Sequence, residues 1–473
     1  MTDRELEARL RAFYRAETGE TETAPLSLRR DVAAIPRAIP QRARWFGRSR
    51  GLTLLAAAAL LLVGGAMAAG SGLVRLPSAV PPEPAPSPAA VVVADPTAGP
   101  TISPSPTETS SAVQPRAASW TPTGDMVGQR LGGTAVLLQD GKVLLFGGNP
   151  GSPNAELYDP ASGTWTATTP TPNAGGTATL LLDGKVLVVG DGATAELYDP
   201  TTGSWTATGK LHTNHFGPTA TLLPDGRVLV AGGVSRGDGV FDPVASAELY
   251  DPRTGSWTRT GSMATKRTGA TATLLRDGMV LVAGGAAPTG NYAGEDVASA
   301  ELYDPGTGIW TKTGRMTQPR SYHEATLLQN GKVLVTTGYG TTSQLYDPGT
   351  GSWTATASPS TLTGGFSVTV LRDGRVLAAG GAPGPQDVGN QSLKCGPSSA
   401  AAELYDPRTG TWTATSDMIQ GRHGHTATLL PDGSVLVASG ATGSWNPSCR
   451  PGIDGPTPSE LSSAELYDPG TGQ

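Results

Sequence analysis

Two short strings alternate from residue 120 to the end of this 473-residue chain, and they constrain its fold more than any other feature. The first is DGKVL or a close variant, and its seven copies start at Asp140, Asp183, Asp225, Asp277, Asn330, Asp373 and Asp432. The second is ELYDP with a loose first position, and its seven tyrosines are Tyr158, Tyr198, Tyr250, Tyr303, Tyr346, Tyr405 and Tyr467. Strict alternation with a period of about 50 residues indicates an array of seven similar structural units.

One repeat unit predicts four antiparallel strands. Residues 219–233 read TATLLPDGRVLVAGG, two apolar runs around an Asp-Gly pair that accepts the positive φ of a tight hairpin turn. Residues 247–260 read AELYDPRTGSWTRT and repeat the design around Asp-Pro-x-Thr-Gly. Each unit is therefore predicted to be a four-stranded meander, and the chain an all-β, seven-bladed β-propeller.

Glycine and proline are abundant, at 64 and 40 residues, which alone would also fit a disordered or a collagen-like chain. Hydrophobic residues make up 37% and no Gly-X-Y period runs through the chain, so neither alternative is favoured. The two repeated turns account for 17 of the glycines.

The units resemble the kelch repeat family over residues 119–473, with a diglycine after the second strand, as at Gly284-Gly285, and a Tyr and a Trp about seven residues apart. Glycine suits a place where neighbouring backbones approach too closely for a Cβ. The pair is altered in blades two, five and seven, at Gly190-Asp191, Thr337-Gly338 and Ser439-Gly440, and these blades are expected to pack slightly differently. The repeated tryptophans, expected to wedge between blades, are Trp120, Trp165, Trp205, Trp257, Trp310, Trp353 and Trp412.

The two ends of the repeat complement each other. The last ELYDP, residues 465–469, stops before its tryptophan, whereas Trp120 has no ELYDP before it. We expect the strand around Trp120 to complete the last blade and close the ring, which removes unpaired sheet edges.

The region before the propeller divides into three parts. Residues 1–50 hold eleven arginines and seven acidic residues, and residues 51–74 carry no charge and are rich in leucine and alanine. This pattern predicts a single transmembrane helix over 51–74, with 1–50 cytoplasmic and the propeller extracellular. A signal peptide cleaved after Ala68 is the alternative. Residues 75–118 contain eleven prolines and are predicted to be a disordered, extended linker.

The cytoplasmic part begins with an amphipathic pattern over residues 2–17, which predicts a short helix that lies on the membrane or docks a cytosolic protein. In outline, this tail, single span and exported domain resemble membrane-bound anti-sigma factors. That resemblance implies transmembrane signalling, a third functional alternative. The residues after 50 carry a net charge of −10, which argues against nucleic acid as a partner.

The connections between the second and third strands vary in length and all fall on one face of a propeller, which we call the long-loop face. They are long in blades three, four, six and seven, and such variation marks a face that is free to specialise. Cys395 and Cys449 lie in the last two of these loops and are predicted to form a disulfide, with two free thiols as the alternative. The loop carboxylates that raise the alternative of calcium binding are Asp238, Asp242, Glu295 and Asp296.

The same face should carry the starts of the innermost strands, where the aligned residues are Arg130, Asn173, His215, Arg267, Arg320, Gly364 and Arg422, followed in two blades by His323 and His425. Two interpretations remain open. The cations form a binding ring for a carboxylate or an acidic sugar, with Arg130, Arg267, Arg320, His323, Arg422 and His425 as binding residues. Alternatively, each arginine bonds to backbone and carboxylates within its own blade.

The adjacent pair Tyr322 and His323 resembles the stretch in galactose oxidase and its copper-radical relatives where an adjacent Tyr and His bind copper. That resemblance implies copper ligation by these two residues. Those enzymes also need a second histidine from a domain after the propeller, and we expect no such domain in this chain. Copper and calcium therefore remain alternatives to a chain without a cofactor.

These observations predict a membrane-anchored, extracellular propeller that binds a glycan or protein on its long-loop face. A galactose-oxidase-like or sugar-modifying enzyme is the alternative from another functional class, and the sequence does not decide whether the chain is an enzyme.

Overall fold

The structure is a computed structural model, and it describes residues 116–148, 155–171, 176–190, 192–237, 240–288, 295–337, 342–362, 364–382, 386–387, 393–394, 397–443 and 459–470. The predicted cytoplasmic tail, transmembrane helix and most of the linker lie outside these residues, as do Asn173, Asp238, Cys395 and Cys449. All regular elements of the described residues are strands, and none of these residues forms a helix that could cross a membrane.

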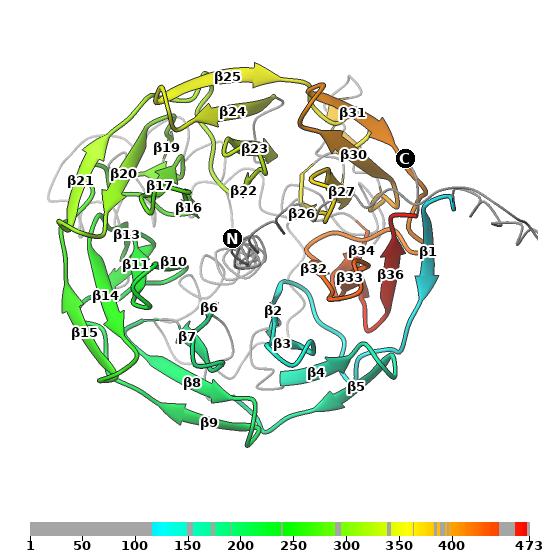
Figure 1. The fold of residues 1–473 in the computed structure, drawn as a ribbon, viewed down its shortest axis with the longest axis horizontal. Coiled ribbons are helices and arrows are strands. Elements are labelled where there is room, and N and C mark those ends of the chain that lie inside the picture. The colour runs from blue at the N-terminus through cyan, green and yellow to red at the C-terminus, as the bar shows by residue number, and fades with distance from the viewer. Residues whose placement is uncertain are drawn as a thin grey trace, which may run out of the picture. The chain divides into compact units, whose positions relative to one another are not determined.

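Seven four-stranded antiparallel sheets, the predicted blades, lie around a common centre (Figure 1). From the innermost to the outermost strand, blades one to four are β2 (Gly133–Leu137), β3 (Val143–Gly147), β4 (Ala155–Asp159) and β5 (Thr164–Ala167); β6 (Gly176–Leu180), β7 (Val186–Gly190), β8 (Ala195–Asp199) and β9 (Ser204–Ala207); β10 (Thr219–Leu222), β11 (Val228–Ala231), β14 (Ala247–Asp251) and β15 (Ser256–Arg259); and β16 (Thr271–Leu274), β17 (Val280–Ala283), β20 (Ala300–Asp304) and β21 (Ile309–Lys312).

The remaining three blades have the same strand order. They are β22 (His323–Leu327), β23 (Val333–Thr337), β24 (Ser343–Asp347) and β25 (Ser352–Thr356); β26 (Phe366–Val370), β27 (Val376–Gly380), β30 (Ala402–Asp406) and β31 (Thr411–Ala414); and β32 (Thr426–Leu429), β33 (Val435–Ala438), β36 (Ala464–Asp468) and β1 (Ser119–Pro122). The outermost strand of blade seven thus comes from the start of the described chain, with Trp120 opposite Tyr467. The innermost strands contact their neighbours all the way round, including β2 with β32.

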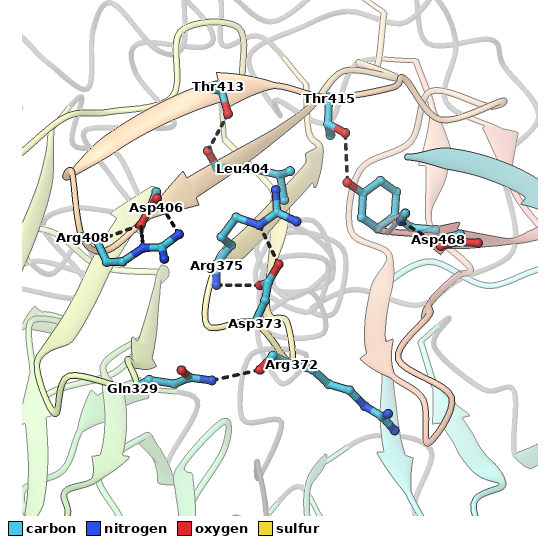
Figure 2. Close-up of polar contacts among 12 residues, drawn as sticks. Gln329, Arg372, Asp373, Arg375, Leu404, Asp406, Arg408, Thr413, Thr415 and Asp468 are labelled. Atoms are coloured by element: carbon cyan, nitrogen blue, oxygen red, sulfur yellow. Dashed lines mark hydrogen bonds and ion pairs between the residues drawn. The ribbon is translucent and has the colours of Figure 1, made fainter. Parts of the chain in front are cut away.

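The two repeated turns are built by their aspartates, as blade six shows (Figure 2). The Asp373 carboxylate accepts the Arg375 amide at 2.9 Å and its guanidinium at 2.7 Å, while Gly374 adopts the positive φ of 89° that the hairpin turn requires. In the ELYDP turn, Asp406 accepts the Arg408 amide at 2.8 Å. Hydrogen bonds from Arg408 hold the pKa of Asp406 below its usual range. Both predicted hairpins are confirmed.

The hydrophobic core lies between adjacent blades rather than within one blade. Trp257 of blade three is 5% exposed and packs with Leu187 and Val189 of blade two. Its indole Nε1 donates to the Gly209 carbonyl at 2.8 Å, and its ring lies 5.0 Å from the Tyr250 ring. We call the contact between two neighbouring blades the joint. In six blades the strand-four tryptophan makes such a bond to the preceding blade's side of the joint, namely Trp120, Trp205, Trp257, Trp310, Trp353 and Trp412. These tryptophans thus contact the preceding blade through both ring packing and a hydrogen bond.

The diglycine after the second strand is a point of close approach between blades. A Cβ added to Gly284 would lie 2.5 Å from the Arg320 carbonyl oxygen of the next blade. The following residue, Gly285, donates its amide to that same carbonyl at 2.9 Å. In blade seven the altered pair keeps this bond, because Ser439 adopts a φ of 66° and the Gly440 amide reaches the Arg130 carbonyl at 2.9 Å.

We predict that Gly284→Ala lowers the stability of the propeller by about 2 kcal/mol or more, because the added Cβ meets backbone and the position has a φ of 63°. Thermal unfolding followed by circular dichroism measures the effect. The matched control is Gly306→Ala in an exposed turn, where the nearest atom to a new Cβ is an Asp304 carboxylate oxygen at 3.3 Å. Equal loss of stability in both variants would contradict this account of the diglycine.

Candidate functional site

Four two-stranded extensions gather at the long-loop face. They extend the connections of blades three, four, six and seven, the four that the sequence predicts to be long. They are β12 (Val234–Gly237) with β13 (Val240–Pro243), β18 (Ala286–Ala287) with β19 (Glu295–Asp296), β28 (Gln386–Asp387) with β29 (Leu393–Lys394), and β34 (Ala441–Thr442) with β35 (Ser459–Glu460). In three blades the extension also bridges to the segment before the innermost strand, in the pairs Phe216–Val234, Thr268–Ala286 and His423–Ala441. The extensions therefore lie beside the starts of the innermost strands.

The arginines at those strand starts lie inside the blades. Arg130, Arg267, Arg320 and Arg422 are each at most 1% exposed. The Arg267 guanidinium donates to the Glu301 carboxylate at 2.7 Å and to the Gly284 and Ser299 carbonyls at 2.7 and 2.9 Å. Arg422 repeats this pattern with Glu465 at 2.7 Å, and Arg130 pairs with Glu156. These contacts are those of the second interpretation, in which each arginine binds groups of its own blade.

The glutamate of the ELYDP string binds both the buried arginine and the segment that enters the blade, a role that was not predicted from the sequence. Glu301 accepts the amides of Ala264 and Thr265 at 2.6 and 3.1 Å, from the segment that enters its blade. The same two-amide contact is made by Glu156, Glu248, Glu403 and Glu465. The available signal was a glutamate that recurs at one position, between apolar residues, in the third strand of six blades.

Blades three and five vary this joint. In blade three, His215 replaces the arginine and bonds the Gly232 carbonyl through Nδ1 at 2.7 Å, while His212 bonds Glu248 at 2.8 Å. Burial alone would raise the pKa of Glu248, but the hydrogen bonds from His212 and Thr213 outweigh it and the pKa is lowered. In blade five, Gln344 replaces the glutamate and accepts the Thr317 amide at 2.8 Å.

His323 and His425 occupy equivalent places between blades. The His323 Nε2 lies 2.9 Å from the Thr271 hydroxyl of blade four, and the His425 Nε2 lies 2.8 Å from the Ser367 hydroxyl of blade six. Both rings are buried, at 4% and 3% exposure. Burial and the nearby arginines lower the pKa of each to about 3, so both histidines are neutral at physiological pH.

Tyr322 has a left-handed backbone conformation at a position where other blades carry glycine. Its φ is 54°, a left-handed value that is unusual for an aromatic residue and costs about 1–3 kcal/mol. Tyr322 stands two residues after Arg320. In the other blades that start with an arginine or histidine in the described ranges, the residue at this position is a glycine with a φ of 58–74°. These glycines are Gly132, Gly217, Gly269 and Gly424. Tyr322 is partly exposed and stands where the fold otherwise uses glycine.

Glu324 follows in β22, where the other innermost strands have threonine or serine at the aligned position. It is the one acidic residue in the seven innermost strands as the structure describes them. Burial raises its pKa to about 7.

The side chains around Tyr322 and His323 do not fit a copper site. The His323 ring is enclosed between blades, with Cε1 only 2.6 Å from where a Cβ on Gly284 would stand and Nε2 bonded to Thr271. Within the described ranges no three His, Cys, Asp or Glu side chains are grouped to hold a metal ion. Of the proposed calcium ligands, Asp242 pairs with Lys266 at 2.7 Å and Asp296 accepts the Ser321 hydroxyl at 2.5 Å.

Comparisons with known proteins agree with the fold. No protein-family model matches the chain, and no curated protein matches it. A similar solved structure is a fungal alcohol oxidase of the AA5 family in complex with copper. Its TM-score is 0.56 at 19% sequence identity, and the match covers 75% of this chain and 76% of that one. At this identity the likeness concerns the propeller fold, and the copper belongs to the oxidase.

We predict that Glu301→Ala destabilises the propeller by about 3–5 kcal/mol, because Arg267 then stays buried without its carboxylate and two amides lose their acceptor. Glu301→Gln, which reproduces the natural residue of blade five, should lose about 1–2 kcal/mol less than Glu301→Ala, because an amide oxygen still accepts the two backbone amides although Arg267 loses its counter-charge. Chemical denaturation of both variants measures the difference, and a loss below about 1 kcal/mol in Glu301→Ala would refute the role assigned to the carboxylate.

A second prediction concerns acid stability. The unfolded histidine pKa is near 6.5, so acid between about pH 6.5 and 3 protonates His323 in the unfolded chain but not in the folded one. Stability from this residue is therefore fully present above pH 6.5 and is lost as the pH falls towards 3. His323→Gln should reduce the difference in bound protons between the unfolded and the folded state by about one proton. The Tm of this variant should therefore fall less steeply between pH 7 and 4. An unchanged slope would count against the buried neutral imidazole.

Proposed function

We propose that this chain is a membrane-anchored, extracellular propeller whose long-loop face binds a glycan or protein partner. The observation that carries the proposal is the gathering of four strand extensions on that face, beside the starts of the innermost strands. Variable segments on a rigid frame are a common arrangement for recognition, because the frame holds them while their sequences vary.

The chemistry of the frame favours binding over catalysis. The repeated Arg and Glu residues are buried and bonded to one another, and His323 and His425 are enclosed between blades. A catalytic acid or base must reach its substrate, and these groups do not. Recognition by exposed side chains that the structure describes in the extensions, such as Arg236 and Glu295, needs no such group.

The anchoring and closure of the ring belong to the same proposal. The uncharged stretch 51–74 would hold the chain in the membrane and the proline-rich residues 75–118 would space the propeller from it. We propose that β1, paired with β36 through Trp120 and Tyr467, closes the ring.

The loops can be tested one at a time with a graft from the same chain. Replacing the extension of blade three, four, six or seven by the short connection of blade two, residues 191–194, should leave the fold intact. At least one graft should lower binding of the full chain to its ligand by about tenfold or more on a glycan array or a cell-surface protein array. The control is Arg253→Ala in an exposed ELYDP turn, which should bind normally. Full binding by all four grafts would move the site away from the long-loop face.

A galactose-oxidase-like activity is the alternative, suggested by the similar fold of the copper-bound oxidase. Copper titration of the full chain with electron paramagnetic resonance separates the two. We expect no tightly bound Cu(II) that depends on Tyr322 and His323. A Cu(II) signal lost in both Tyr322→Phe and His323→Ala would instead establish the oxidase-type site.

A further inference from the structure

The feature that carries a more specific inference is the backbone strain at Tyr322. Just before their innermost strands, several blades are linked to the next by a backbone bond between left-handed residues. These bonds run from Tyr322 to Gly269, from Gly424 to Gly365 and from Gly132 to Gly424, at 2.8, 3.3 and 3.0 Å. A glycine would serve this bond without strain. The tyrosine is therefore not needed by the joint, and a role for its side chain is indicated.

The ring of Tyr322 lies across the joint on the neighbouring blade. A Cβ on Gly269 would stand 2.7 Å from the ring carbons Cδ1 and Cε1, so the glycine of blade four makes room for the aromatic ring. This contact fixes one face of the ring against backbone while the side chain stays partly exposed. An aromatic ring held in this way is preorganised for stacking.

Polar groups of blades four and five bond to each other immediately before Tyr322 in the chain. The preceding residue, Ser321, donates its hydroxyl to Asp296 at 2.5 Å, and Asp296 belongs to β19, the extension of blade four. The other strand of that extension, β18, bridges to Thr268, the residue before Gly269. An aromatic ring and a hydroxyl-bound carboxylate thus belong to the same contact between blades four and five, at neighbouring positions of the chain.

We propose that Tyr322 is the stacking platform of a binding site for a neutral sugar, with Asp296 as hydrogen-bond acceptor for its hydroxyls. A pyranose presents an apolar C–H face that packs on an aromatic ring and an equatorial rim of hydroxyls that carboxylates accept. The proposal deepens the binding function proposed above and rests on it.

The test uses the full chain, an array of neutral hexose and N-acetylhexosamine oligosaccharides, and three variants. Tyr322→Gly should weaken binding to the array glycan that the parent chain binds by about tenfold or more. The Tm of this variant should stay the same or rise by a few degrees, because the backbone strain is relieved. Tyr322→Phe keeps the ring and should bind within about threefold of the parent chain. Ser439→Gly is the matched control, because Ser439 is the other described non-glycine residue with positive φ, and its replacement should leave binding unchanged.

Three outcomes would overturn the inference. Tyr322→Gly binding as tightly as the parent chain would remove the ring from the site, although the loop grafts could still establish binding on that face. Loss of binding in Tyr322→Phe as well as in Tyr322→Gly would show that the hydroxyl, not the ring face, is used. Binding only of acidic glycans or of a protein would exclude a neutral sugar while leaving the proposed function intact.

Discussion

The joint between neighbouring blades is the interaction on which the rest of this structure depends. At its centre is one arginine, whose carbonyl accepts the amide of the second glycine from the preceding blade, as Arg267 does from Gly233 at 2.9 Å. Its guanidinium is bound to a glutamate and to carbonyls of its own blade. The charge is buried, so removing either partner leaves an uncompensated ion, and the pair is far more costly to break than a surface salt bridge.

This joint explains why recurrent charged residues need not mark a site. Glu301 neutralises Arg267 and also accepts two amides of the entering segment, so one carboxylate orders both the ion and the backbone. A tryptophan and a tyrosine complete the outer part of the same interface, through Trp310 to the Gly261 carbonyl and through Tyr303 to the Thr260 hydroxyl. Chemistry that varies between blades, rather than chemistry that repeats, therefore points to function.

Much of the frame could be predicted from the sequence because its signals are local and repeated sevenfold. The Asp-Gly and Asp-Pro-x-Thr-Gly turns, the four strands of each unit and the close approach at the diglycine all followed from residue types at fixed spacing. The partner of each arginine could not be chosen, because burial depends on how blades pack. The loop carboxylate Asp296 was noted, but its bond to Ser321 joins two blades and has no local pattern. The strain at Tyr322 had a visible signal in the glycines at the equivalent places of other blades, and it was not used.

The left-handed residues before the innermost strands have an evolutionary consequence. The bond between these residues uses only backbone atoms, so a glycine there can be exchanged for a larger residue at a local cost in strain where the new side chain has room. Gly217 has such room, whereas a Cβ on Gly269 or Gly424 would stand 2.7 Å from a side chain of the next blade. A propeller built in this way offers a new side chain a position in some blades without a change to the arginine or the glutamate. Recognition can then change one blade at a time while the ring itself is conserved.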